Sequence, residues 1–503
     1  MDHTSLPIIK NLTRVAPPQI RRHERVFAVM FALVFFAIWL LPFWGPVLIP
    51  AALAYIVFAY DLYWTFQALY GTACAVVSYR RMQAWRQIDW RQRYAQMGRS
   101  VYQVVVIPNL GERVETLRAT LQALTQVDYP TEQMAVVLAM EEREEGALAK
   151  AETLQAEFAG RFAHIWISTH PLLAHETAGK GTNLAYAARQ AKRRCDELGW
   201  DSAKVLVTTI DADTRLHSQY LAALAAQFLT TDQPTRKFFQ GILLLMNNIW
   251  DVHAPIRALS AFWTFTFVTG VTHYERMTTA VYSTSLRLLE EIGYWDLRAP
   301  VEDGRLFFRA FFALKGQVEV VPIYLPIGLD AVASRNLWTA LSIQFRQMRR
   351  WAWTVSNLPF IAYQWQRHPE ISWRRKLQKC YPYVESLLII PASWFVITMG
   401  GILPGLINPA MQSSVFGWPL SLIAPIILAP SVVGVIAGLA INLRLRAQYA
   451  PRPRPVSRLY RVLQWGEWLL LPLAGVVYFS VPYLQSYWRL LLGNDLEYER
   501  TPK

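Results

Sequence analysis

Long apolar runs stand at the two ends of this chain, and residues 102–326 between them contain no such run. The runs cover residues 26–44, 46–77, 383–406, 420–443 and 465–487. A helix of about 20 apolar residues is long enough to cross a lipid bilayer. The pattern therefore predicts membrane helices at both ends and a water-exposed domain in the middle.

Basic residues flank the apolar runs instead of forming a single stripe. They are Arg21, Arg22 and Arg25; Arg80, Arg81 and Arg86; and Arg444, Arg446, Arg452, Arg454, Arg458 and Arg461. Cytoplasmic loops of membrane proteins carry such an excess of Arg and Lys, and the same charges attract anionic lipid headgroups. We therefore expect a multi-pass protein of the cell (inner) membrane with its middle domain in the cytoplasm, and no nucleic-acid partner despite the net charge of +14.

The same reasoning divides the chain into six parts. We predict a cytoplasmic segment (1–25), two transmembrane helices (26–78), a cytoplasmic catalytic domain (79–340), interfacial helices (341–376), two or three transmembrane or re-entrant segments (377–487) and a C-terminal tail (488–503). The last apolar run contains Pro472 and Pro482. If it crosses, the tail lies outside; if it bends back, the tail lies inside.

Composition restricts the remaining classes. With 53% hydrophobic residues in 503, the chain is too long and too apolar for one soluble domain. Its three cysteines lack a C-x-x-C pair, so neither a disulfide framework nor a structural zinc site is expected. The polar first two dozen residues argue against a cleaved signal peptide. Asp61 lies in an apolar run but among aromatic residues, which favours a structural role at the membrane interface.

Strand and helix patterns alternate through the middle domain. Residues 104–107, 135–140, 165–168 and 205–210 are strand-like, and a helical period follows the first of them. Such alternation predicts an α/β fold with a mostly parallel sheet covered by helices on both faces. Ligands of these sheets bind beyond the carboxyl ends of the strands.

The triplet Asp211-Ala-Asp213 follows the fourth strand directly. One or two carboxylates can hold a hard divalent ion that neutralises a diphosphate. In an extended segment, side chains two residues apart lie on the same side. The alternative is ordinary helix capping by Asp213. The position at a strand end favours a metal site formed by Asp211 and Asp213.

Glu302-Asp303 begins a second helical segment. A carboxylate at a helix N-terminus is kept ionised by the helix dipole and by backbone N–H groups. Such a group can take the proton of an attacking hydroxyl. We predict Asp303 as this base and Glu302 as its support; simple capping is the alternative.

Gln347, Arg350 and Trp351 share one face of a predicted helix over residues 341–366. A guanidinium can bind a diphosphate bidentately, and an indole offers a flat face to a sugar ring or a nucleobase. Arg and Trp also mark any helix in the membrane interface. We predict a donor-binding role because this string follows the two carboxylate strings.

These strings, in this order, resemble membrane-integrated family 2 glycosyltransferases, which include cellulose and hyaluronan synthases. The resemblance covers about residues 104–353. The family's Pro-x-x-x-Glu turn matches residues 108–112, and its Gly-Lys segment matches Gly179-Lys180 in a shortened form. Glu141-Glu142 stands where Asp-Asp is usual, and Val301 replaces the usual Thr before Glu-Asp. The Glu-Glu-Arg string and residues 247–250 resemble those of an uncharacterised bacterial subgroup.

The resemblance implies a GT-A (Rossmann-like) fold, inverting transfer, a Mg²⁺ or Mn²⁺ ion and a UDP- or GDP-sugar donor. It also implies that Glu141 and Glu142 contact the nucleotide and that Lys180 contacts the diphosphate. The expected activity is a hexosyltransferase that serves polysaccharide biosynthesis or modifies a lipid acceptor. Processive synthesis and single transfer both remain open, and a catalytically inactive nucleotide-sugar-binding membrane scaffold is the alternative function.

Overall fold

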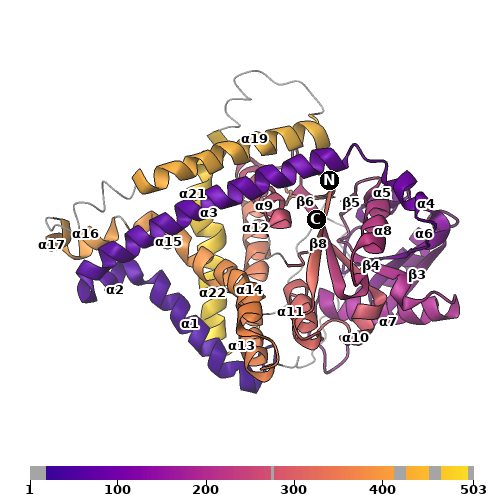
Figure 1. The fold of residues 1–503 in the computed structure, drawn as a ribbon, viewed down its shortest axis with the longest axis horizontal. Coiled ribbons are helices and arrows are strands. Elements are labelled where there is room, and N and C mark those ends of the chain that lie inside the picture. Colours follow the sequence, from indigo (N-terminus) through magenta and orange to yellow (C-terminus); the bar gives the residue numbers. More distant parts are fainter. Residues whose placement is uncertain (1–17, 274–276, 401, 413–425, 453–465, 497–503) are drawn as a thin grey trace.

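The computed structural model describes residues 18–273, 277–400, 402–412, 426–452 and 466–496 (Figure 1). Most of the predicted N-terminal segment, part of the C-terminal tail and the arginines 454, 458 and 461 lie outside these residues. Figure 1 shows the sheet with its covering helices on one side and the long apolar helices on the other.

An eight-stranded mixed sheet forms the centre of the middle domain. Its strands are β1 (Tyr102–Pro108), β2 (Met134–Glu141), β3 (His164–His170), β4 (Val205–Thr209), β5 (Arg215–Leu216), β6 (Lys237–Leu245), β7 (Tyr282–Ser285) and β8 (Glu319–Leu329), in the order β3-β2-β1-β4-β7-β6-β8-β5. Strands β1 to β4 are parallel, and β6 is parallel to β8. The antiparallel strand β7 joins the two groups.

The four strands that the sequence predicted are β1 to β4, and their 3-2-1-4 order is that of a Rossmann-like half-sheet. Every residue of β2 and β4 is buried. Strands covered on both faces consist of continuous β-branched and apolar runs, which is why these four were recognisable. The antiparallel β7 was not expected, so the sheet is mixed where a mostly parallel one was predicted.

Helices cover both faces of this sheet, as expected for an α/β domain. One apolar core lies between the sheet and α5 (Val114–Leu124), α6 (Ala147–Glu157) and α8 (Tyr220–Thr230). The other core lies between the opposite face and α7 (Lys180–Glu197), α10 (Leu286–Glu291) and α11 (Asp303–Ala313). Helices α7 and α11 both begin at the edge where the parallel strands end. Two of the predicted site strings therefore meet at one place.

Helix α9 (Ala254–Thr272) is a 19-residue element in the region where the sequence indicated no long apolar run. It follows β6 and packs against α3 (Pro50–Trp85), α19 (Val432–Tyr449) and the start of the last apolar helix. Arg257, Ser260 and Thr264 interrupt its apolar pattern but are buried. Helix α9 therefore joins the sheet domain to the apolar helices.

Three helices among the described residues are long and apolar enough to cross a membrane: Trp373–Ile397, Ile426–Tyr449 and Glu467–Leu492. A fourth candidate is a bent pair, Arg22–Trp39 with Leu41–Leu48, whose two parts meet at 72°. Helix α3 has 36 residues but does not reach the same hydropathy, because polar and aromatic residues interrupt it. The predicted division into transmembrane segments therefore stays a prediction.

The predicted interfacial segment forms α12 (Leu337–Ala352), a 3₁₀ turn (Trp353–Ser356) and α13 (Asn357–Arg367). Helix α12 packs against α22 (Val481–Leu492) and the π-helical segment Val476–Ser480. It lies between the sheet domain and the last apolar helix. The three cysteines are free and buried, in agreement with the sequence.

Candidate active site

Lys180, Asp211, Glu302 and Asp303 come together at the carboxyl edge of the sheet, and we call them the Lys180 cluster. The Lys180 ammonium donates to Asp211 Oδ1 at 2.8 Å and lies 3.4 Å from Glu302 Oε1. It also donates to the carbonyl oxygen of Ala280 at 3.2 Å. The Ala280 N–H donates in turn to Asp303 Oδ2 at 3.1 Å. The backbone of one residue, Ala280, thus bridges Lys180 and Asp303.

The starts of α7 and α11 fit closely against each other in this cluster. A Cβ atom on Gly181 would lie 2.9 Å from the Cβ of Glu302, closer than real Cβ atoms approach. Glycine at position 181 therefore lets Lys180 reach Glu302. Gly304, directly after Asp303, likewise has no room for a side chain because the Tyr383 hydroxyl lies against it.

The charges of the cluster depend on one another. Burial lowers the pKa of Lys180, but the carboxylates of Asp211 and Glu302 outweigh burial and hold this pKa above its ordinary value. Burial raises the pKa of Glu302, although Lys180 opposes the rise. A positive Lys180 beside several carboxylates suits a site that receives a diphosphate. The raised pKa of Glu302 fits a supporting role better than that of the base.

Asp211 and Asp213 have different surroundings. Residues 211–214 form a tight turn, in which the Thr214 N–H donates to the Asp211 carbonyl at 3.1 Å, instead of the extended segment that the sequence indicated. The Asp211 carboxylate is 28% exposed beside Lys180. The Asp213 carboxylate is buried and accepts from the Asp330 N–H at 3.0 Å. Asp213 therefore also fixes the loop after β8.

The donor set of this turn fits a hard divalent cation that shares its coordination with substrate. Mg²⁺ and similar ions use one or two protein carboxylates together with phosphate oxygens and waters. The accessible Asp211 and the neighbouring Asp213 offer such carboxylates. Within the described residues, no three His, Cys, Asp or Glu side chains form a complete metal site without substrate.

The predicted nucleotide contacts lie at the end of β2. Glu141 is buried and ion-paired with Arg143, with 2.5 Å between Oε2 and Nε, whereas Glu142 is exposed. Burial raises the pKa of Glu141, although Arg143 opposes the rise. The two residues therefore have different surroundings, and their contacts with a nucleotide stay a prediction.

A third carboxylate near this strand end was missed. Glu144 is buried and accepts from Asn109 Nδ2 at 2.7 Å and from the Gly111 N–H at 2.5 Å, and it pairs with Lys150. It thereby holds the turn after β1. In the run of four acidic residues around Arg143, nothing in the sequence distinguishes it.

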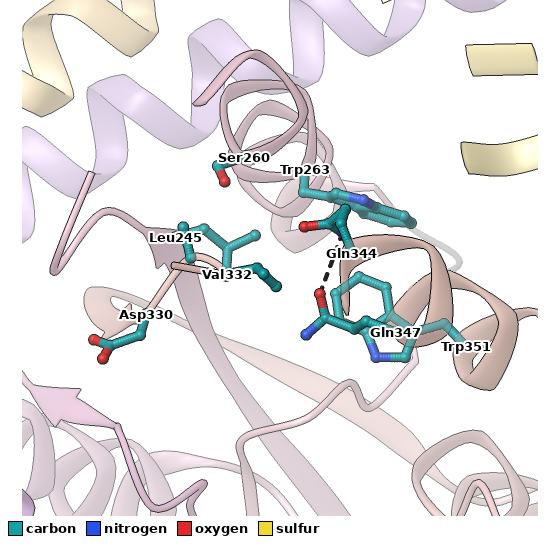
Figure 2. A pocket seen from close by; sticks show the side chains of 9 residues that line it. Leu245, Ser260, Trp263, Asp330, Val332, Gln344, Gln347 and Trp351 are labelled. Atoms are coloured by element: carbon teal, nitrogen blue, oxygen red, sulfur yellow. Dashed lines mark hydrogen bonds between the residues drawn. The ribbon is translucent and has the colours of Figure 1, made fainter. Parts of the chain in front are cut away.

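Gln347 and Trp351 line a pocket whose lining includes none of the four residues of the Lys180 cluster, and we call it the aromatic pocket (Figure 2). Its lining residues are Leu245, Ser260, Trp263, Asp330, Ala331, Val332, Gln344, Gln347 and Trp351. Trp263 of α9 stands edge-on to Trp351 of α12, with 5.1 Å between ring centroids. Asp330 lines the pocket, and its N–H binds Asp213, so this loop connects the pocket to the aspartate turn.

Two amide side chains give the pocket its polar groups. Gln344 Nε2 donates to Gln347 Oε1 at 3.2 Å, and both side chains are buried (Figure 2). Arg350, the third residue of the predicted string, does not line this pocket. Trp263 and Gln344 were missed by sequence reasoning because they belong to no recognised motif.

Comparison with known protein families gives one match, which covers part of the chain. Residues 206–440 match the sequence model described as "Glycosyl transferase family group 2". The matched segment contains Asp211, Asp213, Glu302 and Asp303, together with α12. The chain therefore carries a glycosyltransferase domain and is an enzyme of that class. No curated protein gives a significant sequence match to the chain.

Solved structures give distant likenesses. The mannosyltransferase PcManGT from Pyrobaculum calidifontis, in complex with GDP-Man and Mn²⁺, has a TM-score of 0.42 and 14% identity over 88% of this chain and 98% of its own. S. aureus TarS has a TM-score of 0.29 and 13% identity over 71% of this chain and 57% of its own. M. tuberculosis glucosyl-3-phosphoglycerate synthase has a TM-score of 0.31 and 14% identity over 53% of this chain and 83% of its own. At these scores, the functional conclusion depends on the family match and on the site itself.

Proposed function

We propose that the protein is an inverting, metal-dependent hexosyltransferase with a GT-A catalytic domain. It moves a sugar from a UDP- or GDP-sugar to a polysaccharide or lipid acceptor at the cytoplasmic face of the membrane. The observation that carries this proposal is the Lys180 cluster. It brings together a partly buried ammonium, an accessible carboxylate at a strand end and a carboxylate held by the backbone, all joined by direct contacts.

The residues divide the reaction between them. Asp303 takes the proton from the acceptor hydroxyl as the hydroxyl oxygen bonds to the anomeric carbon. The bond from that carbon to the diphosphate breaks, and the electron pair leaves with the diphosphate. Lys180 stabilises the leaving negative charge. A divalent ion held by Asp211 and Asp213 would supply further charge neutralisation there.

The aromatic pocket fits a neutral sugar better than a diphosphate. Its indoles offer apolar faces, Gln344 and Gln347 offer amide groups for hydroxyls, and the only charged side chain in its lining is the acidic Asp330. A carboxylate would repel a phosphate group. We therefore propose that Gln347 and Trp351 bind the acceptor sugar instead of the donor.

The last apolar helix, Glu467–Leu492, makes contacts with the catalytic side at both of its ends. At its start, Glu467 accepts from Arg257 Nε of α9 at 2.9 Å, and both side chains are buried. Just beyond its end, the Leu496 carbonyl accepts from Gln19 Nε2 at 2.8 Å, and Trp353 donates to the Gln19 side chain at 2.6 Å. We propose that this helix lies in the membrane interface and that the C-terminal tail is cytoplasmic.

A fusion experiment tests this topology. Alkaline phosphatase or a fluorescent protein is fused after Lys503, with fusions after Arg86 as the cytoplasmic reference. The fluorescent fusion should be active and the phosphatase fusion inactive at both positions. A phosphatase-active C-terminal fusion would show that the helix crosses the membrane.

The activity itself is tested on purified protein with a panel of UDP- and GDP-sugars, with and without Mn²⁺. We expect metal-dependent release of nucleotide diphosphate from at least one donor, and loss of this release in Asp303→Asn. The absence of release from every donor with every metal, or an Asp303→Asn variant with full activity, would refute the proposed function.

A further inference from the structure

The backbone of Ala280 has an unusual conformation for its residue type. Its φ of +49° lies in the left-handed region, which residues with a Cβ rarely adopt. Three other non-glycine residues among those described share a positive φ, namely Gln233, Tyr294 and Lys315, and none of them contacts the Lys180 cluster. Strained backbone of this kind persists where the surroundings hold it, and it concentrates at functional sites.

Both polar groups of Ala280 are used by the cluster. Its N–H donates to Asp303 Oδ2 at 3.1 Å, and its carbonyl accepts from Lys180 at 3.2 Å. The Thr278 hydroxyl adds a bond to the Asp303 carbonyl at 2.8 Å. The segment 278–281 therefore holds the proposed base at two points and meets the lysine at a third. We call this segment the Ala280 strap.

A buried glutamine holds the strap from the other side. Gln240 Oε1 accepts from the Thr279 N–H at 2.9 Å, and its Nε2 donates to the Val281 carbonyl at 2.8 Å. Gln240 lies where the pairing of β6 with β8 shifts register, and it is 3% exposed. Its amide thus binds the backbone of the residues before and after Ala280, which helps to hold the strained conformation.

We propose that the Ala280 strap, locked by Gln240, is the positioning element that aims Asp303 and sets its distance from Lys180. This inference rests on the proposed function, in which Asp303 is the base. The strained residue presents its N–H to one charged group and its carbonyl to the other, and an ordinary backbone conformation at position 280 would turn at least one of them away.

The strap should affect the chemical step more than donor binding. A backbone N–H that donates to a carboxylate fixes its direction and favours its ionised form. Without this bond, the Asp303 carboxylate becomes less well aimed at the acceptor hydroxyl. The titratable groups that face Asp303 are Lys180, Glu302, Tyr282 and Tyr383, and all four stay in place in the variants below.

The main test is Ala280→Val in the full-length protein, because a β-branched residue is strongly disfavoured at positive φ. We expect kcat to fall about 100-fold, within the range that a positioned base contributes. The KM for the donor should stay near that of wild type, which separates loss of aim at Asp303 from loss of donor binding. Ala280→Gly is the conservative variant and should keep most of the wild-type kcat.

Lys315→Val is the matched control. Lys315 has a φ of +50° but is exposed in the turn after α11, away from the cluster. The substitution should lower thermal stability without changing kcat. An equal loss of kcat in Lys315→Val and Ala280→Val would overturn the proposal, as would a folded Ala280→Val variant with wild-type kcat.

Gln240→Leu is the second variant and decides the question if Ala280→Val does not fold. It removes both amide contacts and nearly keeps the side-chain volume, so the same fall in kcat with an unchanged donor KM is expected. Wild-type kinetics in Gln240→Leu would overturn the proposal. Asp303→Asn distinguishes failure of the proposed function from failure of the strap proposal. An active Asp303→Asn variant refutes the proposed function. An inactive Asp303→Asn variant, together with wild-type kinetics in Ala280→Val and Gln240→Leu, refutes only the role of the strap.

Discussion

The Lys180 cluster and the aromatic pocket differ in how they are built. The cluster consists of charged groups at strand ends and helix starts, and backbone atoms hold them. The pocket consists of aromatic and amide side chains from α9 and α12, and both helices pack on the last apolar helix. Trp263, for example, stacks on Phe479 of that helix with 5.1 Å between centroids. The four residues of the cluster thus all belong to the sheet domain, whereas the pocket is formed by helices that pack on the last apolar helix.

This difference suggests that the two regions have separate roles in the reaction. Charge and proton transfer belong to the cluster, and recognition of the acceptor belongs to the pocket beside the membrane. Asp330, which lines the pocket while its N–H binds Asp213, is the described link between them. Substitutions in the two regions should therefore change different kinetic constants.

Asp303→Asn should have the largest effect. Loss of the proton acceptor is expected to lower kcat by about 10² to 10⁴, the usual contribution of a general base. Because Asp303 makes no donor contact in the proposed mechanism, the affinity for nucleotide should not change. Steady-state kinetics and calorimetric titration with UDP and GDP check both points. A weakened nucleotide affinity with unchanged kcat would place Asp303 in donor binding instead.

Lys180→Met should have the next largest effect. It removes a charged hydrogen bond to the leaving group, which corresponds to about 10- to 100-fold in kcat/KM for the donor. Lys192→Met is the control on the same helix, because Lys192 pairs with Asp196 outside the site. The comparison fails if both variants lose activity to the same extent.

Trp351→Ala and Trp263→Ala should have smaller effects, confined to the acceptor. A lost aromatic contact of about 0.5–1.5 kcal/mol corresponds to an increase in acceptor KM of roughly two- to tenfold. Trp338→Ala is the control, since Trp338 lies in the first turn of α12 but is 77% exposed. A change in donor KM in either pocket variant would contradict the division.

Glu319→Gln should have the smallest effect, a loss of thermal stability. It tests the ion pairs between strand β8 and the apolar helix that begins at Trp373. Glu319 accepts from Lys379 at 2.9 Å and pairs with Arg375. Burial raises the pKa of Glu319, but these hydrogen bonds outweigh burial and lower it. A lowered folded-state pKa gives stability that is present at neutral pH and is lost as the pH falls through that pKa.

The partly exposed Glu319 should contribute no more than about 1 kcal/mol at neutral pH. Thermal unfolding of wild type and Glu319→Gln should differ at pH 7, and the difference should disappear as the pH falls below the ordinary Glu pKa of about 4.3. Glu157→Gln, which removes an exposed pair with Arg118, is the control. A difference that grows as the pH falls would show that the ion pair is not the source.

The sequence predicted the cluster better than the pocket for a physical reason. Asp211 follows a buried strand and Asp303 starts a helix, so local patterns already singled out both residues, whereas their common neighbour Lys180 is placed between them only by the fold. Ala280, Gln240 and Trp263 acquire their roles only through contacts with distant segments. Helix α9 escaped notice because its buried polar residues hide an apolar pattern.

The most direct test of this account is a side-by-side measurement of kcat and acceptor KM for Asp303→Asn and Trp351→Ala. The account predicts a crossed result: a large fall in kcat with acceptor KM near wild type for Asp303→Asn, and a raised acceptor KM with kcat near wild type for Trp351→Ala. If both substitutions change the same constant in the same proportion, the two regions do not divide the reaction as proposed.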